Sequence, residues 1–176
     1  MTTPHPLIDQ ILDIHSDVLK QDIRKYKNHV YRVYELTQII DPSEANQEKY
    51  AIAGAFHDLG IWTNNTFDYL NPSVGLAKEY LKANGKEDWI DEISLMIDMH
   101  HKLSKYEGKF VNTVETFRRA DSIDVMLGLL RYGVKKSDIR KIRKAYSNSC
   151  FHWFLIVQST KNFFKHPLNP LPMFKR

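Results

Sequence analysis

The chain is nearly devoid of cysteine. Cys150 is the only one among 176 residues, so neither an intramolecular disulfide nor a cluster of thiolate metal ligands can form. A protein without disulfides fits a reducing compartment. The first residues also lack the basic and apolar stretches of a secretory signal peptide, and we therefore expect a cytoplasmic location.

Long hydrophobic runs are missing as well. The most apolar stretch, Phe151–Val157, is far shorter than the roughly 20 residues that a membrane-spanning helix needs. We expect a core helix there rather than a membrane-surface segment, and no membrane partner. A large excess of charge of one sign is also absent. Lys and Arg exceed Asp and Glu by four, which is compatible with an anionic substrate but argues against nucleic acid as a partner.

The sequence has no segment with the period-two alternation of a β-strand, no internal repeat and no low-complexity run. Apolar residues recur instead at helical spacing, and the length suffices for one domain with a full core. We predict an all-α fold, a compact multi-helix bundle in which residues 1–176 form a single domain. The helical pattern covers residues 7–19, 26–40, 50–58, 73–83, 87–102 and 111–130. Between the second and third helices, Pro42-Ser43 fits one helix end and the next helix start.

Three segments lie between or beyond these helices. The irregular stretch Trp62–Pro72 is either a wall or lid over a site or an ordinary packed connection. The basic stretch Arg131–Lys144 is either a phosphate-attracting patch or, as we favour, a solvated helix face. The proline-rich end, Pro167–Pro172, predicts an extended tail.

The strongest local signal is the adjacent pair His57-Asp58 at the end of an apolar helix. An imidazole and a carboxylate are costly to bury unless a partner offsets their desolvation. Both groups are good ligands for divalent metals, so a bound cation would offset both costs together. Gly60 stands two residues after the pair, as expected where a helix ends in a left-handed residue.

Three further segments extend this signal. His29, His57-Asp58 and Asp121 stand in that order on inward helix faces, within the stretches His29-Val-Tyr-Arg32-Val33, His57-Asp58-Leu-Gly60 and Arg118-Arg-Ala120-Asp121-Ser-Ile-Asp124. The set resembles the HD superfamily of metal-dependent phosphohydrolases, whose signature is H…HD…D on an all-α scaffold. The resemblance covers residues 28–124, followed by C-terminal helices and a tail over 131–176. It implies that His29, His57, Asp58 and Asp121 together hold one divalent transition metal, which would be Mn, Fe, Co, Ni or Zn.

The resemblance also implies a reaction, in which a metal-activated water cleaves a small phosphate ester, with nucleotides among the candidates. The implied partner is thus a small phosphorylated substrate, and a homo-oligomer stays open. As catalytic residues we predict Asp58, His100 and Asp124, the last of which has a structural role as an equal alternative. As substrate-binding residues we predict Arg32, Arg118, Lys102, Trp62 and Tyr69.

Two departures from the family pattern keep other functions open. Where some members carry a carboxylate or a lysine shortly after the HD pair, this chain has Ile61 and Trp62. Moreover, His100 and His101 are neighbours on one predicted helix, about 100° apart, so we expect only His100 to face the site and a second metal to be disfavoured. The alternatives are a di-iron oxygenase of the HD fold and a non-catalytic metal-binding HD module. We expect the remaining histidines, His5, His15, His152 and His166, to lie outside the site.

Overall fold

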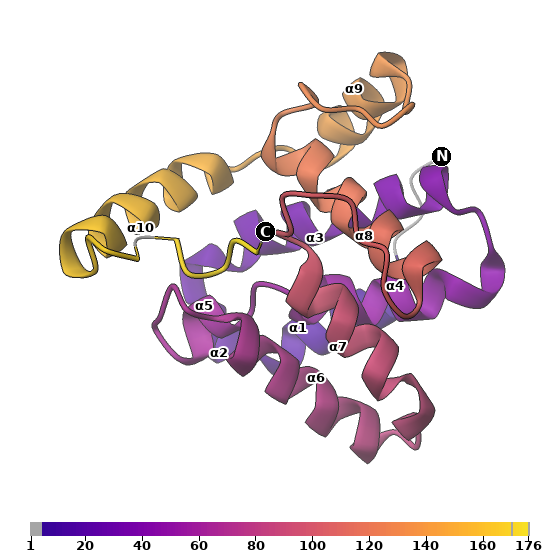
Figure 1. Ribbon diagram of the computed structural model, residues 1–176, viewed down its shortest axis with the longest axis horizontal. Helices are drawn as coiled ribbons and strands as arrows, with labels where there is room; N and C mark the ends of the chain where they lie inside the picture. The colour runs from indigo at the N-terminus through magenta and orange to yellow at the C-terminus, as the bar shows by residue number, and fades with distance from the viewer. Residues whose placement is uncertain (1–4, 170, 176) are drawn as a thin grey trace.

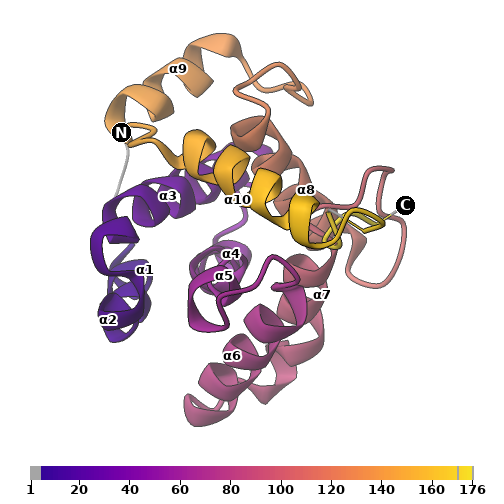
Figure 2. The ribbon, with the colours of Figure 1, turned by 90° about the vertical axis from the view of Figure 1, so that its left-hand side faces the viewer.

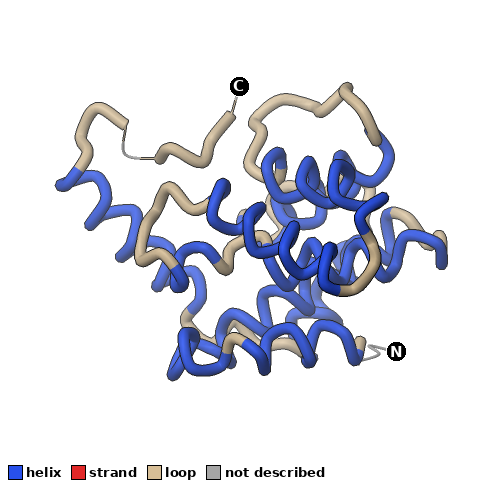
Figure 3. Tube along the Cα trace, turned by 90° about the horizontal axis from the view of Figure 1, so that it is seen from below, coloured by secondary structure: helices blue, strands red, loops and turns tan. Residues whose placement is uncertain are grey.

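The computed structural model describes residues 5–169 and 171–175 (Figure 1). Within these residues the chain is helical and forms no β-strand, only a single isolated bridge between Lys102 and Lys175 (Figure 3). The predicted all-α fold is therefore confirmed. None of the described helices is both long and apolar enough to cross a membrane.

The elements follow one another with short connections. They are α1 (Pro6–Ile14), α2 (Ser16–Leu19), the 3-10 helix η1 (Lys20–Asp22), α3 (Ile23–Ile40), α4 (Glu44–Phe56), α5 (Gly60–Thr63), α6 (Leu70–Ala83), the 3-10 helix η2 (Glu87–Trp89), α7 (Ile90–Met99), α8 (Val111–Val125), α9 (Lys136–Ala145) and α10 (Phe151–Lys165).

Helix α3 lies at the centre of the bundle. It packs against α8, α4 and α1, while α7 packs between α8 and α6 (Figures 1 and 2). Apolar residues at helical spacing line these contacts, as Val30 and Val33 do on α3 and Ile93 and Ile97 on α7. Helices α9 and α10 lie at the edge of this bundle, and Figure 2 shows α10 crossing in front of α3 and α8.

Several predicted helix boundaries are confirmed. Helix α3 ends at Ile40 and α4 begins at Glu44, and both oxygens of Asp41 accept hydrogen bonds across this connection. Helix α6 ends at Ala83, just before Gly85 with its left-handed φ of 65°. The first predicted helix, residues 7–19, is however broken into α1 and α2 at His15.

Helix α8 is shorter than predicted, because it ends at Val125 instead of Leu130. Leu127 and Gly128 both adopt left-handed φ angles, 56° and 78°, and the Gly128 N–H donates to the carbonyl of Ile123 at 2.8 Å. A left-handed residue closes a helix by such a backward hydrogen bond. The following leucines are consequently exposed.

Gly60 is needed for a different reason from the one predicted. It begins α5 and is not among the residues with positive φ. A Cβ at this position would lie 2.5 Å from the carbonyl oxygen of Tyr69 and 2.9 Å from Oγ of Ser73. Glycine therefore allows the turn after His57-Asp58 to pack closely against the start of α6, and the irregular stretch shrinks to residues 64–69.

The C-terminal region differs most from prediction. Only Phe151 of α10 is buried, so the expectation of a core helix is wrong. The tail is not extended either, because the Asn169 N–H donates to the carbonyl of His166 at 3.1 Å and the Phe174 N–H to that of Leu171 at 3.2 Å, and both hydrogen bonds close turns. Beyond it, Met173 is buried and the Leu103 N–H donates to the carbonyl of Lys175 at 2.8 Å. Pro170, within the predicted tail, lies outside the described residues. The end of the chain thus returns to the turn that follows α7 (Figure 3).

Candidate metal centre

Four buried polar side chains converge at the centre of the bundle. His29 comes from the middle of α3, His57 and Asp58 from the turn after α4, and Asp121 from α8. Nε2 of His29 lies 2.9 Å from Nε2 of His57 and 3.5 Å from a carboxylate oxygen of each aspartate. Nε2 of His57 lies 3.3 Å from Asp58 and 3.8 Å from Asp121. These residues are those predicted as metal ligands, and the structure brings them together.

The hydrogen bonds of the two histidine rings fix which nitrogen faces the centre. Nδ1 of His29 lies 2.8 Å from Oδ2 of Asp124, and Nδ1 of His57 lies 2.8 Å from the carbonyl of Gly54. Because an ionised carboxylate and a carbonyl only accept, each Nδ1 carries the proton and donates it. The two Nε2 lone pairs then point at each other. Facing lone pairs repel unless a cation lies between them, which a proton or a metal ion can provide.

The spacing of these donors fits a metal ion. A cation about 2.1 Å from each ligand has neighbouring donors about 3.0 Å apart at right angles and about 3.4 Å apart at the tetrahedral angle. The observed separations of 2.9 to 3.8 Å fall around these values. Among the described residues, Oδ1 of Asp58 and Oδ1 of Asp121 are moreover buried without a hydrogen-bond partner. Buried polar atoms without partners are rare in proteins; a metal at His29 and His57 would satisfy the Asp121 oxygen, and one at His100 would satisfy the Asp58 oxygen.

A second group of donors adjoins the first. Nε2 of His100 lies 3.5 Å from Oδ1 of Asp58, and Nδ1 of His101 lies 3.6 Å from Oδ2 of Asp121. Donor atoms of Asp58, His100 and His101 all lie within 4.8 Å of one another. Nδ1 of His100 donates to the carbonyl of Ile97 at 2.6 Å, so its Nε2 is again the free ligand atom. Each aspartate thus turns one oxygen toward each group.

The expectation that only one of the neighbouring histidines faces the site is therefore wrong. Helix α7 ends at Met99, and both histidines follow it: His100 keeps helical backbone angles (φ −63°, ψ −25°) as the C-cap, and His101 lies in the turn after it. The two rings lie 3.9 Å apart between centroids. His101 is the site residue that the sequence analysis missed, since no proline or glycine marks the end of α7.

Asp124 orients His29 and does not face the centre. Its two oxygens are held by His29 and by Arg32, whose Nε and Nη2 donate at 2.7 and 2.8 Å. These contacts hold the pKa of Asp124 far below its usual range despite burial, so it is a carboxylate. Phe151 of α10 stacks on the other face of His29, with centroids 4.1 Å apart. The prediction that Asp124 is catalytic is corrected, and its alternative structural role is the one observed.

The electrostatics of the first group favour a cation. Burial alone lowers the pKa of His29, but its hydrogen bond to Asp124 and the neighbouring carboxylates raise it to about 9. Burial raises the pKa of Asp58, yet the adjacent histidines hold it well below its usual range. Burial also raises the pKa of Asp121. In the metal-free protein, protons are thus held where a metal would bind, which is the competition expected at a metal site.

Both arginines predicted to bind substrate are engaged elsewhere. Arg32 is fully buried and its guanidinium is held by Asp124 and by the carbonyls of residues 146 and 147. Arg118 donates two hydrogen bonds to Glu115 and one to the carbonyl of Lys102. Their assignment as substrate ligands is therefore wrong, because each guanidinium already has its partners. The role of the Lys102 side chain stays a prediction.

The aromatic residues of the predicted wall separate into two roles. Trp62 packs between Tyr26 and Phe154, and its Nε1–H donates to Asp22 at 2.9 Å, so it supports the fold away from the centre. The Tyr69 hydroxyl, in contrast, lies 2.8 Å from Nε2 of His101. Tyr69 therefore borders the site, and the stretch is part packed connection and part wall.

The centre is most open beside His101. The side chain of His101 is 15% exposed, whereas those of the five other candidate ligands are at most 5% exposed. The ring of Phe174, from the returning C-terminal segment, lies 5.3 Å from that of His101. The other four histidines stay outside the site, as expected, although His152 contacts α8 through the carbonyl of Asp124.

Fold and site together define a class, an all-helical protein with buried histidine and aspartate donors arranged for a metal. The family model of the HD domain matches residues 26–126, more than half of the chain, and the chain belongs to this family. The match spans the stretch from α3 to α8 that supplies every candidate ligand. Neither the comparison with curated proteins nor that with solved structures finds a match.

Proposed function

We propose that the protein is a metal-dependent phosphohydrolase that cleaves a small phosphate ester, with nucleotides as the leading candidates. The observation that carries the proposal is the convergence of four buried donors whose free atoms face one another at ligand spacing. Membership of the HD family supports it. A bound divalent metal would supply a water of lowered pKa and polarise a phosphoryl oxygen.

The residues of the chain prepare this chemistry before a substrate arrives. Asp124 and the carbonyl of Gly54 hold the His29 and His57 rings in one tautomer each. The Tyr26 hydroxyl accepts a hydrogen bond from the Asp58 N–H at 3.3 Å and thereby supports the turn that contains His57 and Asp58. Because the side chains are already held in place, they lose little conformational freedom when a metal binds, and metal affinity is therefore higher.

A proton for the leaving oxygen is best supplied from the exposed side. Burial and the nearby Asp58 raise the pKa of Tyr69 well above its usual value, so the hydroxyl keeps its proton. It stands in hydrogen-bond contact with His101, at the most open edge of the centre. We therefore assign the Tyr69–His101 pair, rather than His100, to proton transfer.

Phosphate charge needs a cation that the arginines do not provide. With Arg32 and Arg118 engaged, a second metal held by Asp58, His100 and His101 would provide this positive charge. Two metals bridged by carboxylates are a common arrangement for phosphate-ester cleavage. The same second group of donors is also compatible with the alternative function, a di-iron oxygenase. The identity of the bound metals distinguishes the phosphohydrolase from the oxygenase.

The test is elemental analysis of protein purified without added metal or chelator, followed by a screen for phosphate release. We expect one or two divalent ions per chain and hydrolysis of at least one phosphate ester. In Asp58→Ala, both metal groups lose a ligand, and metal affinity should fall by at least roughly 100-fold together with activity.

Asp68→Ala, in the exposed loop before α6, serves as the matched control and should keep metal and activity. Stoichiometric metal in Asp58→Ala would show that the ligand assignment is wrong. Two irons with dioxygen consumption and no phosphate release would favour the oxygenase. Metal without any turnover would favour a non-catalytic HD module.

A further inference from the structure

Charge is distributed unevenly along the chain. From Met126 to the C-terminus there are 11 Lys and Arg residues and one acidic residue, Asp138, whereas the preceding 125 residues hold 14 basic and 20 acidic residues. The small overall excess of positive charge thus conceals a strongly basic C-terminal segment joined to an acidic body. A segment of this kind attracts anionic surfaces.

Large apolar side chains are exposed on the same segment. Among the described residues, 12 of the 17 exposed large hydrophobic side chains lie between Met126 and Phe174. Four of them share one face of α10, because a rotation of about 100° per residue places all four within an arc of about 100°. This outward row consists of Trp153, Ile156, Phe163 and Phe164, with exposed fractions of 66%, 55%, 51% and 79%.

The opposite face of α10 is fixed to the bundle. Phe151 stacks on His29, and Nε2 of His152 donates to the carbonyl of Asp124 at 3.1 Å. Phe154 lies parallel to the ring of Trp62, 5.1 Å away. Helix α10 therefore cannot turn its outward row toward the protein without breaking these contacts. An outward apolar face held in this way marks an interaction surface.

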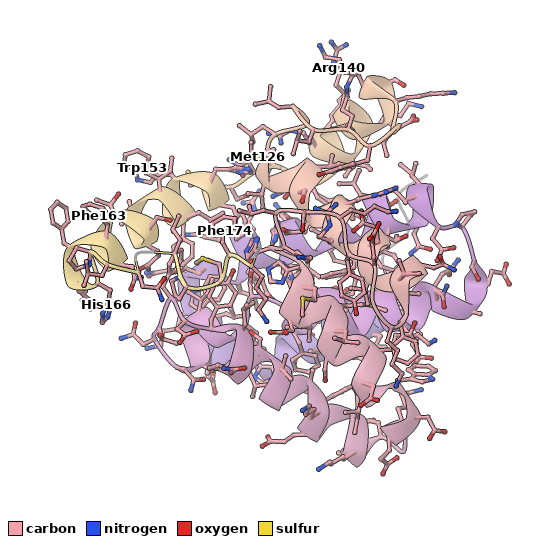
Figure 4. All side chains as sticks on the ribbon, viewed as in Figure 1. Met126, Arg140, Trp153, Phe163, His166 and Phe174 are labelled. Atoms are coloured by element: carbon pink, nitrogen blue, oxygen red, sulfur yellow. The ribbon has the colours of Figure 1, made fainter. Side chains whose placement is uncertain are left out.

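Basic side chains lie on α9, the helix that precedes α10 in the chain. Helix α9 turns Ile139 and Ile142 into the protein, which leaves its Lys and Arg residues on the outside. Figure 4 shows Arg140 projecting from α9, with Met126 and Trp153 along the same side of the molecule and Phe163 near the far end of α10. The exposed basic residues around α9 are Arg131, Lys135, Lys136, Arg140, Lys141 and Lys144.

We propose that the outward row of α10, the 126–132 loop and the basic side chains of α9 form a surface that docks on a bilayer containing anionic phospholipids. The Lys and Arg residues attract the lipid phosphates, and the aromatic side chains enter the interfacial layer. Helices that bind in the plane of a membrane surface combine these two features. This departs from the expectation of no membrane partner, which assumed that α10 was buried.

Two other occupants fit the surface less well. An isologous contact between two copies would set two basic segments against each other, and a head-to-tail contact would find five exposed large hydrophobic side chains among the described residues of the acidic body. Nucleic acid would stack on aromatic side chains such as Trp153, but the exposed aliphatic side chains of Leu129 and Ile156 neither stack on bases nor bond phosphates, whereas a bilayer interface covers both kinds.

The test uses the full chain and vesicles of phosphatidylcholine with or without phosphatidylserine. We expect co-sedimentation with the anionic vesicles only, weakened by added salt. Trp153 reports on insertion, because it is the exposed one of the three tryptophans. Its emission should shift to shorter wavelength on binding, and Trp153→Phe should lose this shift while still binding. Phe164→Ser should weaken binding by roughly tenfold or more.

Matched variants provide the controls. Ile14→Ser removes a similarly exposed apolar side chain from the acidic body and should leave vesicle binding unchanged. Arg140→Glu with Lys144→Glu should abolish the preference for anionic vesicles, whereas Lys78→Glu with Lys82→Glu on α6 should not. The proposal is overturned if the chain binds neither the anionic nor the neutral vesicles. Binding of short oligonucleotides in place of vesicles would also overturn it. So would a dimer that Phe164→Ser dissociates, if the chain does not bind vesicles.

Discussion

The two parts of this chain depart from the usual arrangement of a globular protein in opposite ways. In the part from α1 to α8, ionisable side chains lie in the interior, as His29, Asp58 and Asp121 do around one point. In the part after Met126, large apolar side chains lie on the surface, as Trp153 and Phe164 do on α10. In contact with water alone, ionisable side chains favour the surface and large apolar side chains favour the interior, so both arrangements are unfavourable without a further partner.

Each departure identifies the partner that is needed. Buried donors with free lone pairs need a cation, and their spacing sets its size. Exposed apolar side chains together with Lys and Arg fit the proposed partner, a surface that is both apolar and anionic. Phe151 connects the two parts, since it begins α10 and stacks on the ring of His29. Substitutions should therefore affect the two parts differently: they should lower stability in the buried part and leave it nearly unchanged on the outward row.

The largest effect on the buried part is expected from Asp124→Asn. The amide keeps the volume but leaves Arg32 buried without its carboxylate and no longer fixes the His29 ring. We expect a loss of stability of about 3–5 kcal/mol and metal affinity weakened by about 10- to 100-fold. Denaturant unfolding and metal titration measure the two effects.

The control for this substitution is Asp138→Asn on α9, which breaks only an exposed pair with Lys141 at 3.5 Å. It should change stability by less than about 1 kcal/mol. If Asp124→Asn bound metal as tightly as the unchanged protein, the orienting role of Asp124 would have to be abandoned.

Two glycines test how closely the buried part is packed. In Gly60→Ala the new Cβ would collide with the Tyr69 carbonyl, and we expect a loss of about 1–3 kcal/mol. Gly75→Ala, within α6, meets no atom within 4 Å and should gain about 0.5–1 kcal/mol. Thermal unfolding of both variants gives the difference, and equal melting temperatures would contradict the packing seen at Gly60.

The pH dependence of metal binding tests the proton held in the centre. With a pKa of about 9, His29 is protonated at neutral pH in the metal-free protein, so a metal must displace that proton. Apparent affinity should therefore rise with pH, by about tenfold per unit, and level off above about pH 9. Calorimetry in buffers of different ionisation enthalpy measures the released proton. Binding without proton release would rule out this competition.

A feature of the fold or of the site could be predicted from the sequence when the residues that determine it lie close to one another in the chain. Helices and their ends follow from local patterns, so the all-α fold and the boundary at Pro42-Ser43 were predictable. The four donors His29, His57, Asp58 and Asp121 were found through the resemblance to the HD family, and the structure brings them together.

Features decided by distant contacts could not be predicted. The partner of Arg32 lies 92 residues away, and nothing near either residue reveals the pairing. His101 reaches the centre from the turn after α7, and no local residue type marks where α7 ends. Gly60 was correctly singled out, but its reason is contact with Tyr69, which only the tertiary structure shows.

The smallest effect on stability is expected where exposure is greatest. Trp153 is 66% exposed on α10, so Trp153→Ser should change the free energy of unfolding by no more than about 0.5 kcal/mol. Phe151→Ala, two residues earlier, removes a fully buried ring and serves as the contrasting control, with a loss of about 3–5 kcal/mol. Thermal and denaturant unfolding compare the two. A large loss in Trp153→Ser would mean that this side chain is buried in the protein in solution, so that another part of the chain or a second copy covers the outward row and a bilayer does not.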